Sequence, residues 1–286
     1  MFLKKSVFFI FVFSAVTLFS NTASAASALH LHISKNWAGY AASSDSYTGV
    51  SATWTVPAST QTSKTISADA AWVGIGGMSE SDLIQAGTQA VIRNGRTEYT
   101  AWYELLPDTQ RAVPLPVKAG DRISASVNEV ATGIWRITIT NLTTGQTYQT
   151  SVPYTSSHSS AEWIVERPLA ITGKATGYLP LSNFGNLTFD NATLTTASGQ
   201  SQTVSTSGAE QLIMSTSNTH LIAAPKNQSG SSFDVSYLTS SEGNRYLRSL
   251  RRHYTLKPET TATAPVVQYQ QINTSYVIHV VFGGAH

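Results

Sequence analysis

Carboxylate, amide and indole side chains gather in three segments of the sequence, and their types and spacing could support catalysis. The first segment is Ala71–Gly77, followed closely by Asp82–Gly87, the second is Tyr99–Glu104, and the third is Ala161–Glu166. A carboxylate can take a proton from an attacking water, and an amide can donate a hydrogen bond to the oxyanion that forms. Together, these groups are chemically sufficient to hydrolyse an amide bond without a metal or a covalent intermediate.

Gln85 and Glu166 are the pair that fits this chemistry. Gln85 is a polar residue in a run of small and apolar residues, and Gly87 follows it. Its amide could donate to a carbonyl oxygen while Glu166 activates the water. Buried Gln and Glu are also common as structural hydrogen-bond partners, so the residue types alone leave both interpretations open.

The sequence lacks the short signatures of other hydrolases. It contains no Gly-x-Ser-x-Gly, no His-Glu-x-x-His, no P-loop and no cysteine. His30 and His32 form a His-x-His pair that could bind a metal weakly, but an exposed terminus explains it as well. A Ser-His-Asp triad is recognised by geometry rather than spacing, so the sequence does not exclude one. We expect no metal and no cofactor.

Strand phasing sorts the side chains of the second segment. Trp102 and Glu104 fall on one face of a predicted strand. They could line the wall of a cleft, or they could form a structural packing pair across neighbouring strands.

The third segment has two interpretations. Ser159–Glu162 fits a capping box that would begin a short helix, whereas the β-propensity of Trp163–Val165 favours a strand. On a strand, Glu162 and Glu166 share a face but lie about 13 Å apart. A glycosidase carboxylate pair is separated by ~5–9.5 Å, so these two glutamates do not form one.

The elements that must position these residues are predicted to be strands. Serine and threonine make up about a quarter of the chain, and only 12% of residues are charged. Apolar and polar residues alternate with the period of a half-buried strand in Val50–Val56, Ile123–Val127, Trp135–Thr140 and Thr147–Val152. Turn residues separate these runs. We therefore predict an all-β, antiparallel two-sheet sandwich extending over residues 36–239.

The N-terminus has the pattern of a secretory signal peptide over residues 1–25. Lys4 and Lys5 precede the apolar run Ser6–Phe19, and Ala23–Ala25 is a small-residue cleavage site. Removal of residues 1–25 leaves a chain that begins with a short segment, 26–35. This remaining chain contains sixteen basic and sixteen acidic residues. A chain with no formal net charge lacks the excess of basic residues that is typical of a nucleic-acid-binding protein. We expect a secreted, extracellular protein without a transmembrane segment.

Residues 240–286 differ in composition and form a predicted C-terminal extension of unknown role. Glu242–Lys257 has helical spacing, Pro258–Pro265 is a linker, and Val266–Gln270 and Tyr276–Phe282 are strand-like. The predicted helix carries four arginines, namely Arg245, Arg248, Arg251 and Arg252. They form either a solvated helix face or a weak contact with an anionic surface.

The three segments resemble the glutamic peptidase family, also called eqolisins. The resemblance continues in order through Asn36–Gly39, Val50–Pro57, Asn141–Gln146 and Leu179–Phe189, and fades near Leu238. It implies a concanavalin A-like or jelly-roll type of sandwich and an acid endopeptidase that acts on polypeptides without a cofactor.

The resemblance also implies roles for individual residues. The family's catalytic glutamine falls on Gln85 and its catalytic glutamate on Glu166. Its substrate-binding positions fall on Trp37, Trp72, Gly77, Trp102 and Glu104.

Some positions depart from the fungal members of that family. Gly76 stands in place of an aspartate, and two further acidic cleft positions match Gln89 and Thr100. The chain keeps sixteen basic residues after signal removal, and the resulting charge would repel itself in strong acid. We therefore expect a milder pH optimum than that of the most acidophilic relatives.

Three other functions compete with this interpretation. A non-catalytic glycan-binding sandwich would expose Trp37, Trp72 and Trp102 to sugar rings. A sandwich glycosidase would pair Glu104 with Glu166. A degenerate peptidase fold could serve as a cell-surface adhesin.

Overall fold

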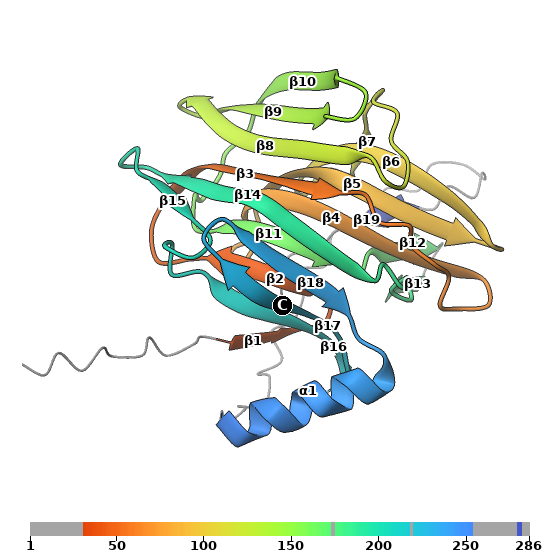
Figure 1. Ribbon diagram of the computed structural model, residues 1–286. Coiled ribbons are helices and arrows are strands. Elements are labelled where there is room, and N and C mark those ends of the chain that lie inside the picture. Colours follow the sequence, from red (N-terminus) through yellow and green to blue (C-terminus); the bar gives the residue numbers. More distant parts are fainter. Residues whose placement is uncertain (1–30, 173–174, 218–219, 254–278, 282–286) are drawn as a thin grey trace, which may run out of the picture.

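The computed structural model describes residues 31–172, 175–217, 220–253 and 279–281. These residues form two layers of antiparallel strands with one helix beneath them (Figure 1). The upper layer contains, in spatial order, β10 (Gln146–Pro153), β9 (Ile134–Asn141), β8 (Arg122–Ala131), β3 (Tyr47–Thr55) and β14 (Asn186–Thr196). The predicted β-sandwich is thereby confirmed.

The lower layer holds the three segments singled out in the sequence. In spatial order it contains β18 (Ser232–Tyr237), β17 (His220–Ser229), β16 (Glu210–Ser217), β2 (Trp37–Ala42), β11 (Ala161–Glu166), β4 (Ile66–Gly76), β5 (Leu83–Arg93), β6 (Arg96–Leu105) and β7 (Arg111–Ala112). The third segment is therefore a strand, β11, and the capping-box helix does not form.

One strand belongs to both layers. The first residues of β14 pair with β18 of the lower layer, and its later residues pair with β3 of the upper layer. The register shifts between Asp190 and Thr193, where Asn191 adopts a φ of 51°. A bulge of this kind bends a strand and increases its twist, which lets β14 pass from one layer to the other.

Five short strands complete the described structure. β1 (Leu31–Ser34) runs parallel to β16, and β15 (Ser201–Thr203) pairs with β14. A separate sheet consists of β13 (Ala175–Tyr178), β12 (Leu169–Thr172) and β19 (His279–Val281). The pattern of the sequence did not predict β1, and β19 lies within the predicted strand-like run Tyr276–Phe282. The signal peptide and the run Val266–Gln270 lie outside the described residues.

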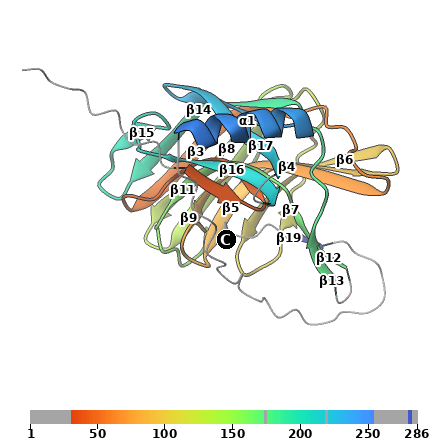
Figure 2. The ribbon, with the colours of Figure 1, turned by 90° about the horizontal axis from the view of Figure 1, so that it is seen from below.

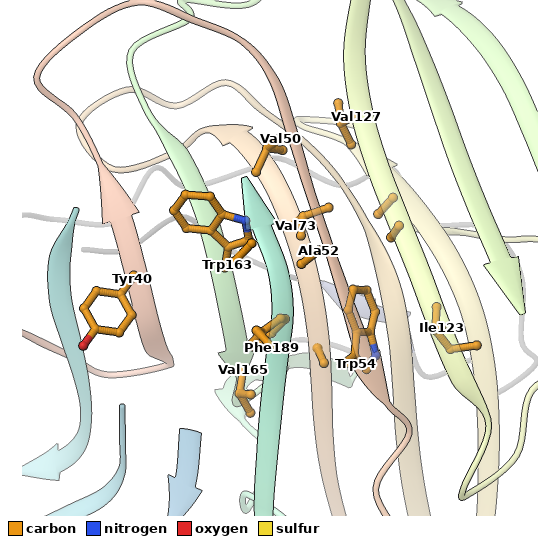
Figure 3. Packing of buried hydrophobic residues seen from close by; sticks show 14 of the residues in the cluster. Tyr40, Val50, Ala52, Trp54, Val73, Ile123, Val127, Trp163, Val165 and Phe189 are labelled. Atoms are coloured by element: carbon orange, nitrogen blue, oxygen red, sulfur yellow. The ribbon is translucent and has the colours of Figure 1, made fainter. Parts of the chain in front are cut away.

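The hydrophobic core lies between the layers. The inward residues of the predicted alternating runs are buried there, for example Val50, Ala52 and Trp54 of β3. Figure 3 shows Trp54, Trp163 and Phe189 packed between strands of the two layers. The indole Nε1 of Trp163 donates to the Ser51 carbonyl oxygen across the core at 2.9 Å, which satisfies the buried donor.

The helix α1 (Ser240–His253) packs against the lower layer on β17 and β16 (Figure 2). A capping box begins it, since the Thr239 backbone N–H donates to the Glu242 carboxylate at 2.9 Å. Leu247 and Leu250 are buried in this contact. A Cβ at Gly243 would lie 2.3 Å from the Leu221 carbonyl oxygen, so only glycine permits this close approach.

A buried aspartate joins β4 to two loops. Asp69 accepts a hydrogen bond from the Ser182 hydroxyl and interacts with Ser59, and Ser182 N–H donates to the Ala68 carbonyl oxygen at 3.0 Å. Burial raises the pKa of Asp69 to about 6. Between about pH 4 and 6 the unfolded chain loses a proton that the folded chain keeps, so stability falls as the pH rises.

We predict that Asp69→Asn weakens this pH dependence. The raised pKa of Asp69 corresponds to about 2 kcal/mol of unfolding free energy lost between pH 4 and pH 7. Urea unfolding at both pH values should therefore show a smaller difference in the variant than in the parent chain. Asp45→Asn, at an exposed position, is the control. An unchanged difference in Asp69→Asn would contradict the assignment.

Candidate active site

The candidate site residues lie on the outer face of the lower layer, opposite the core. On β11, Ala161, Trp163 and Val165 pack in the core, so Glu162 and Glu166 project from the other face, as their spacing predicted. Directly paired residues share a face of the sheet. The row that starts at Glu162 continues through Gly74, Gln85 and Glu104. The row that starts at Glu166 continues through Ala70, Gln89 and Thr100.

Glu166 is fully buried and is held by neutral hydrogen-bond donors. Its Oε2 accepts from Trp72 Nε1 at 2.8 Å, and its Oε1 accepts from Asn36 Nδ2 at 3.1 Å. Burial raises its pKa well above the usual range, and the charge of Glu104 adds to the rise. The hydrogen bond from Trp72 opposes it most, followed by those from Asn36 and Trp37. A carboxyl in this setting keeps its proton to a higher pH than an exposed glutamate does.

Gln85 is fully buried, and a carboxylate orients its amide. Its Nε2 donates to Glu104 Oε2 at 2.7 Å, which fixes the amide nitrogen and leaves its second N–H for another acceptor. Among the described residues, Gln85 Oε1 has no hydrogen-bond partner. A Cβ at Gly74 would lie 3.1 Å from the Gln85 Cβ, so a glycine there lets the Gln85 side chain pack close to β4.

Three tryptophans surround these polar groups. The rings of Trp37 and Trp72 meet edge to face with centroids 4.9 Å apart, and Trp102 joins the same apolar cluster. A Cβ at Gly77 would lie 3.1 Å from Trp37 Cη2, and Gly77 has a φ of 97°, so this position suits glycine. All three indoles are 0% exposed. The expectation that they form exposed platforms for sugar rings is therefore wrong.

The structure thus brings every predicted site residue to one face. Gln85 and Glu104 form one hydrogen-bonded pair, Trp72 and Glu166 form the other, and the charge of Glu104 raises the pKa of Glu166. Trp37, Gly77 and Trp102 supply the apolar surroundings. Among the described residues, no three His, Asp or Glu side chains are placed to hold a metal ion.

Sequence reasoning missed Asn36 as a site residue, although it begins one of the motifs. Its side chain reaches Glu166 across 130 residues of sequence, and Ser34 Oγ contacts its amide oxygen at 3.3 Å. The backbone also joins these segments, since Arg167 N–H donates to the Asn36 carbonyl oxygen at 2.8 Å.

The model of the peptidase A4 family matches residues 35–237, which run from the end of β1 to the last residue of β18. The chain belongs to the peptidase A4 family. Among curated relatives, aspergillopepsin-2 of Aspergillus niger is 31% identical over 186 residues, covering 57% of this chain and 64% of the relative. Scytalidopepsin B of Scytalidium lignicola is 28% identical over 190 residues, covering 64% of this chain and 71% of the relative.

Solved structures agree with this A4 assignment. Scytalido-glutamic peptidase, solved with a transition state analog inhibitor, superposes with a TM-score of 0.62 and 26% identity. That match covers 71% of this chain and 98% of the other. The sequence resemblance to glutamic peptidases is thereby confirmed. In the described part of this family member, no helix is both long and apolar enough to cross a membrane.

We predict that Trp72→Phe raises the pKa of Glu166 further. The indole N–H stabilises the ionised carboxylate, and a hydrogen bond to a charged group contributes ~1.5–3 kcal/mol, equivalent to about one pKa unit or more. Carbon NMR titration of glutamate-labelled protein would measure this change, with Glu166→Gln identifying the signal. Trp54→Phe, which removes a core indole donating to Thr88, should leave the titration unchanged. A Glu166 pKa unaffected by Trp72→Phe would contradict the assignment.

Proposed function

We propose that this protein is an exported acid endopeptidase that hydrolyses peptide bonds with a Glu166–Gln85 dyad. The observation that carries the proposal is the arrangement of the two side chains. A buried carboxyl with a raised pKa and a buried, oriented amide occupy one face of the sheet. Membership of the peptidase A4 family supports peptide bonds as the substrate.

The reaction begins with general-base catalysis. Ionised Glu166 takes a proton from a water as the water oxygen bonds to the carbonyl carbon of the scissile peptide. The carbonyl π electrons move to the oxygen, and the second N–H of Gln85 donates to this oxyanion. Glu104 keeps the amide nitrogen turned toward the site during this step, because it binds the first N–H.

The second step uses the proton that Glu166 has gained. The oxyanion re-forms the carbonyl, the C–N bond breaks, and Glu166 donates the proton to the leaving amine. Trp72 and Asn36 stabilise the carboxylate that results without neutralising its charge. Glu166 is thus restored to its ionised form, and no metal or covalent intermediate enters the cycle.

The electrostatics of the site favour mild rather than extreme acid. Because burial raises the pKa of Glu166, the base becomes protonated and inactive as the pH falls through that value. At higher pH, the buried carboxyl of Asp69 loses its favourable protonated state and stability declines.

Export and surface contact also form part of the proposal. The predicted signal peptide supports secretion, and the A4 family supports a peptidase that acts on polypeptides. Arg245 and Arg248 are exposed on α1, and their contact with an anionic surface stays a prediction.

The decisive test is digestion of casein or denatured globin from about pH 2 to pH 7. We expect peptide release that resists chelators and serine-protease reagents. Glu166→Gln should abolish it because the variant lacks the base, and Gln85→Ala should lower kcat by about 10²–10³. Glu98→Gln and Gln146→Ala, at exposed positions, should leave the rate unchanged. Activity surviving in Glu166→Gln, or absent from folded parent protein, would refute the proposal.

Glu104 separates this mechanism from that of a glycosidase. If Glu104 orients Gln85, Glu104→Gln should lower kcat with little change in KM, because its effect passes through the amide. Hydrolysis of a glycoside that depends on Glu104 as strongly as on Glu166, with Gln85→Ala still active, would instead support the glycosidase. Steady-state kinetics on one fluorogenic peptide and one aryl glycoside distinguish these outcomes.

A further inference from the structure

A cavity of about 610 Å³ lies where β18 leads into α1 (Figure 1). Its strand side includes Lys226 of β17 and Tyr237 of β18, and its helix side includes Glu242, Arg245 and Tyr246 of α1. Small-molecule sites in proteins have volumes of ~300–1,000 Å³, so this cavity is large enough for a ligand. The peptidase A4 model ends at residue 237, so the helical wall lies beyond the region that the family model matches.

The cavity is separate from the proposed active site. Neither Gln85 nor Glu166 lines it. The helix α1 packs on β17 and β16, and these two strands lie between β18 and the strands that carry the dyad. The dyad therefore does not account for this cavity, and binding there can be measured independently of cleavage.

Two cations line this cavity, and their hydrogen-bond donors are unused. Among the described residues, neither Lys226 nor Arg245 forms an ion pair or a side-chain hydrogen bond. The nearby carboxylate of Glu242 is already held, since its Oε2 accepts from the Thr239 N–H at 2.9 Å and from the Thr239 hydroxyl at 2.6 Å. These hydrogen bonds lower the pKa of Glu242, and the charges of Arg245 and Lys226 lower it further.

The second acid near Lys226 is also held by neutral donors. Asp234 of β18 is directly paired with Lys226 of β17. Its Oδ1 accepts from Thr188 Oγ1 at 2.7 Å, and its Oδ2 accepts from Asn227 Nδ2 at 2.7 Å. Both acids therefore have donors, whereas the ammonium and guanidinium groups keep theirs for another acceptor. Because carboxylates form strong, charge-assisted hydrogen bonds with such groups, the cavity suits a ligand that carries a carboxylate.

The uncharged part of the lining suits a sugar. The side chains of Tyr237 and Tyr246 are half-buried, so each presents apolar ring surface beside a polar hydroxyl group. Asn183 and Gly185 line this cavity and also a second one of about 740 Å³, so the two cavities adjoin. Together they have room for several linked sugars rather than for one small anion.

The second cavity adds no unpaired charge. Its charged lining residues are Arg122 and Asp190, and these form an ion pair with an Nη2–Oδ2 distance of 3.0 Å. The neutral groups that line it include the side chains of Thr60, Asn186 and Thr188. A groove with free cations at one end only does not match a nucleic acid, whose repeated phosphates need a row of cations. A hydroxyl-rich chain that bears a carboxylate matches this groove better.

We propose that the two cavities bind an acidic oligosaccharide, with Lys226 and Arg245 holding the carboxylate of a uronic acid. The rings of Tyr237 and Tyr246 pack against the sugar, and neighbouring sugars extend past Asn183 into the second cavity. This inference goes beyond the proposed peptidase function and does not depend on it. Such a site attaches the protein to an acidic glycan, while the dyad lies on other strands.

Calorimetric titration of the full chain with tetragalacturonate tests this site at about pH 5, where uronate carboxyls are ionised. The methyl ester of the same tetrasaccharide is the neutral control ligand. The parent should bind the acid about tenfold or more tightly than the ester, because hydrogen bonds between charged groups contribute most. Arg245→Gln and Lys226→Gln should each weaken binding of the acid about tenfold and leave binding of the ester little changed. Arg96→Gln, at an exposed position on β6, should bind both ligands like the parent.

The outcomes separate the glycan site from the proposed function. Equal binding of the acid and the ester, or binding of the acid that is the same in the parent and in both variants, overturns the site. Binding of inorganic phosphate or of anionic phospholipid vesicles in place of tetragalacturonate also overturns it. Thermal unfolding checks that each variant is folded. Glu166→Gln should bind tetragalacturonate like the parent although its peptidase activity is lost, so failure of one proposal is distinguished from failure of the other.

Discussion

Side chains alternate along a strand, so a slip of one residue between β11 and β4 would move Glu162 and Glu166 into the core and Trp163 out of it. The core prevents this slip. Trp163 is fully buried, and its indole reaches the Ser51 carbonyl oxygen of the opposite layer. Packing on one face of β11 therefore determines the chemistry of the other face, and the placement of Gln85 two strands away follows from the same pairing.

The hydrogen-bond donors around Glu166 are neutral, and this affects the pKa of its carboxyl. An arginine beside a buried carboxylate would lower its pKa and keep it ionised. Indole and amide N–H groups from Trp72 and Asn36 stabilise the anion more weakly, and burial still keeps the pKa high. The carboxyl therefore keeps its proton to a higher pH than an exposed glutamate does, while the neutral donors still stabilise its ionised form. Its neighbour Glu104 uses its own charge to hold an amide and to raise that pKa further.

Local alternation was enough to predict β3, β8 and β9, and strand phasing was enough to place Glu162 and Glu166 on one face of β11. Those patterns reflect burial of one strand face, which is a property of neighbouring residues. The contact of Asn36 with Glu166 joins residues 130 positions apart, and no local pattern encodes it. Burial of the three tryptophans was missed for the same reason, since it depends on neighbours in other strands. The parallel pairing of β1 also depends on a distant partner, β16.

The strand β14 pairs with both layers, and this affects how readily one copy of the protein could be cleaved by another. A shared strand means that neither layer can separate without breaking hydrogen bonds of the other. Separation of the layers therefore requires opening of the β14 pairing with β18 or with β3. Cleavage of a chain requires an extended, accessible segment, so this connection limits the self-digestion that partly open states would permit.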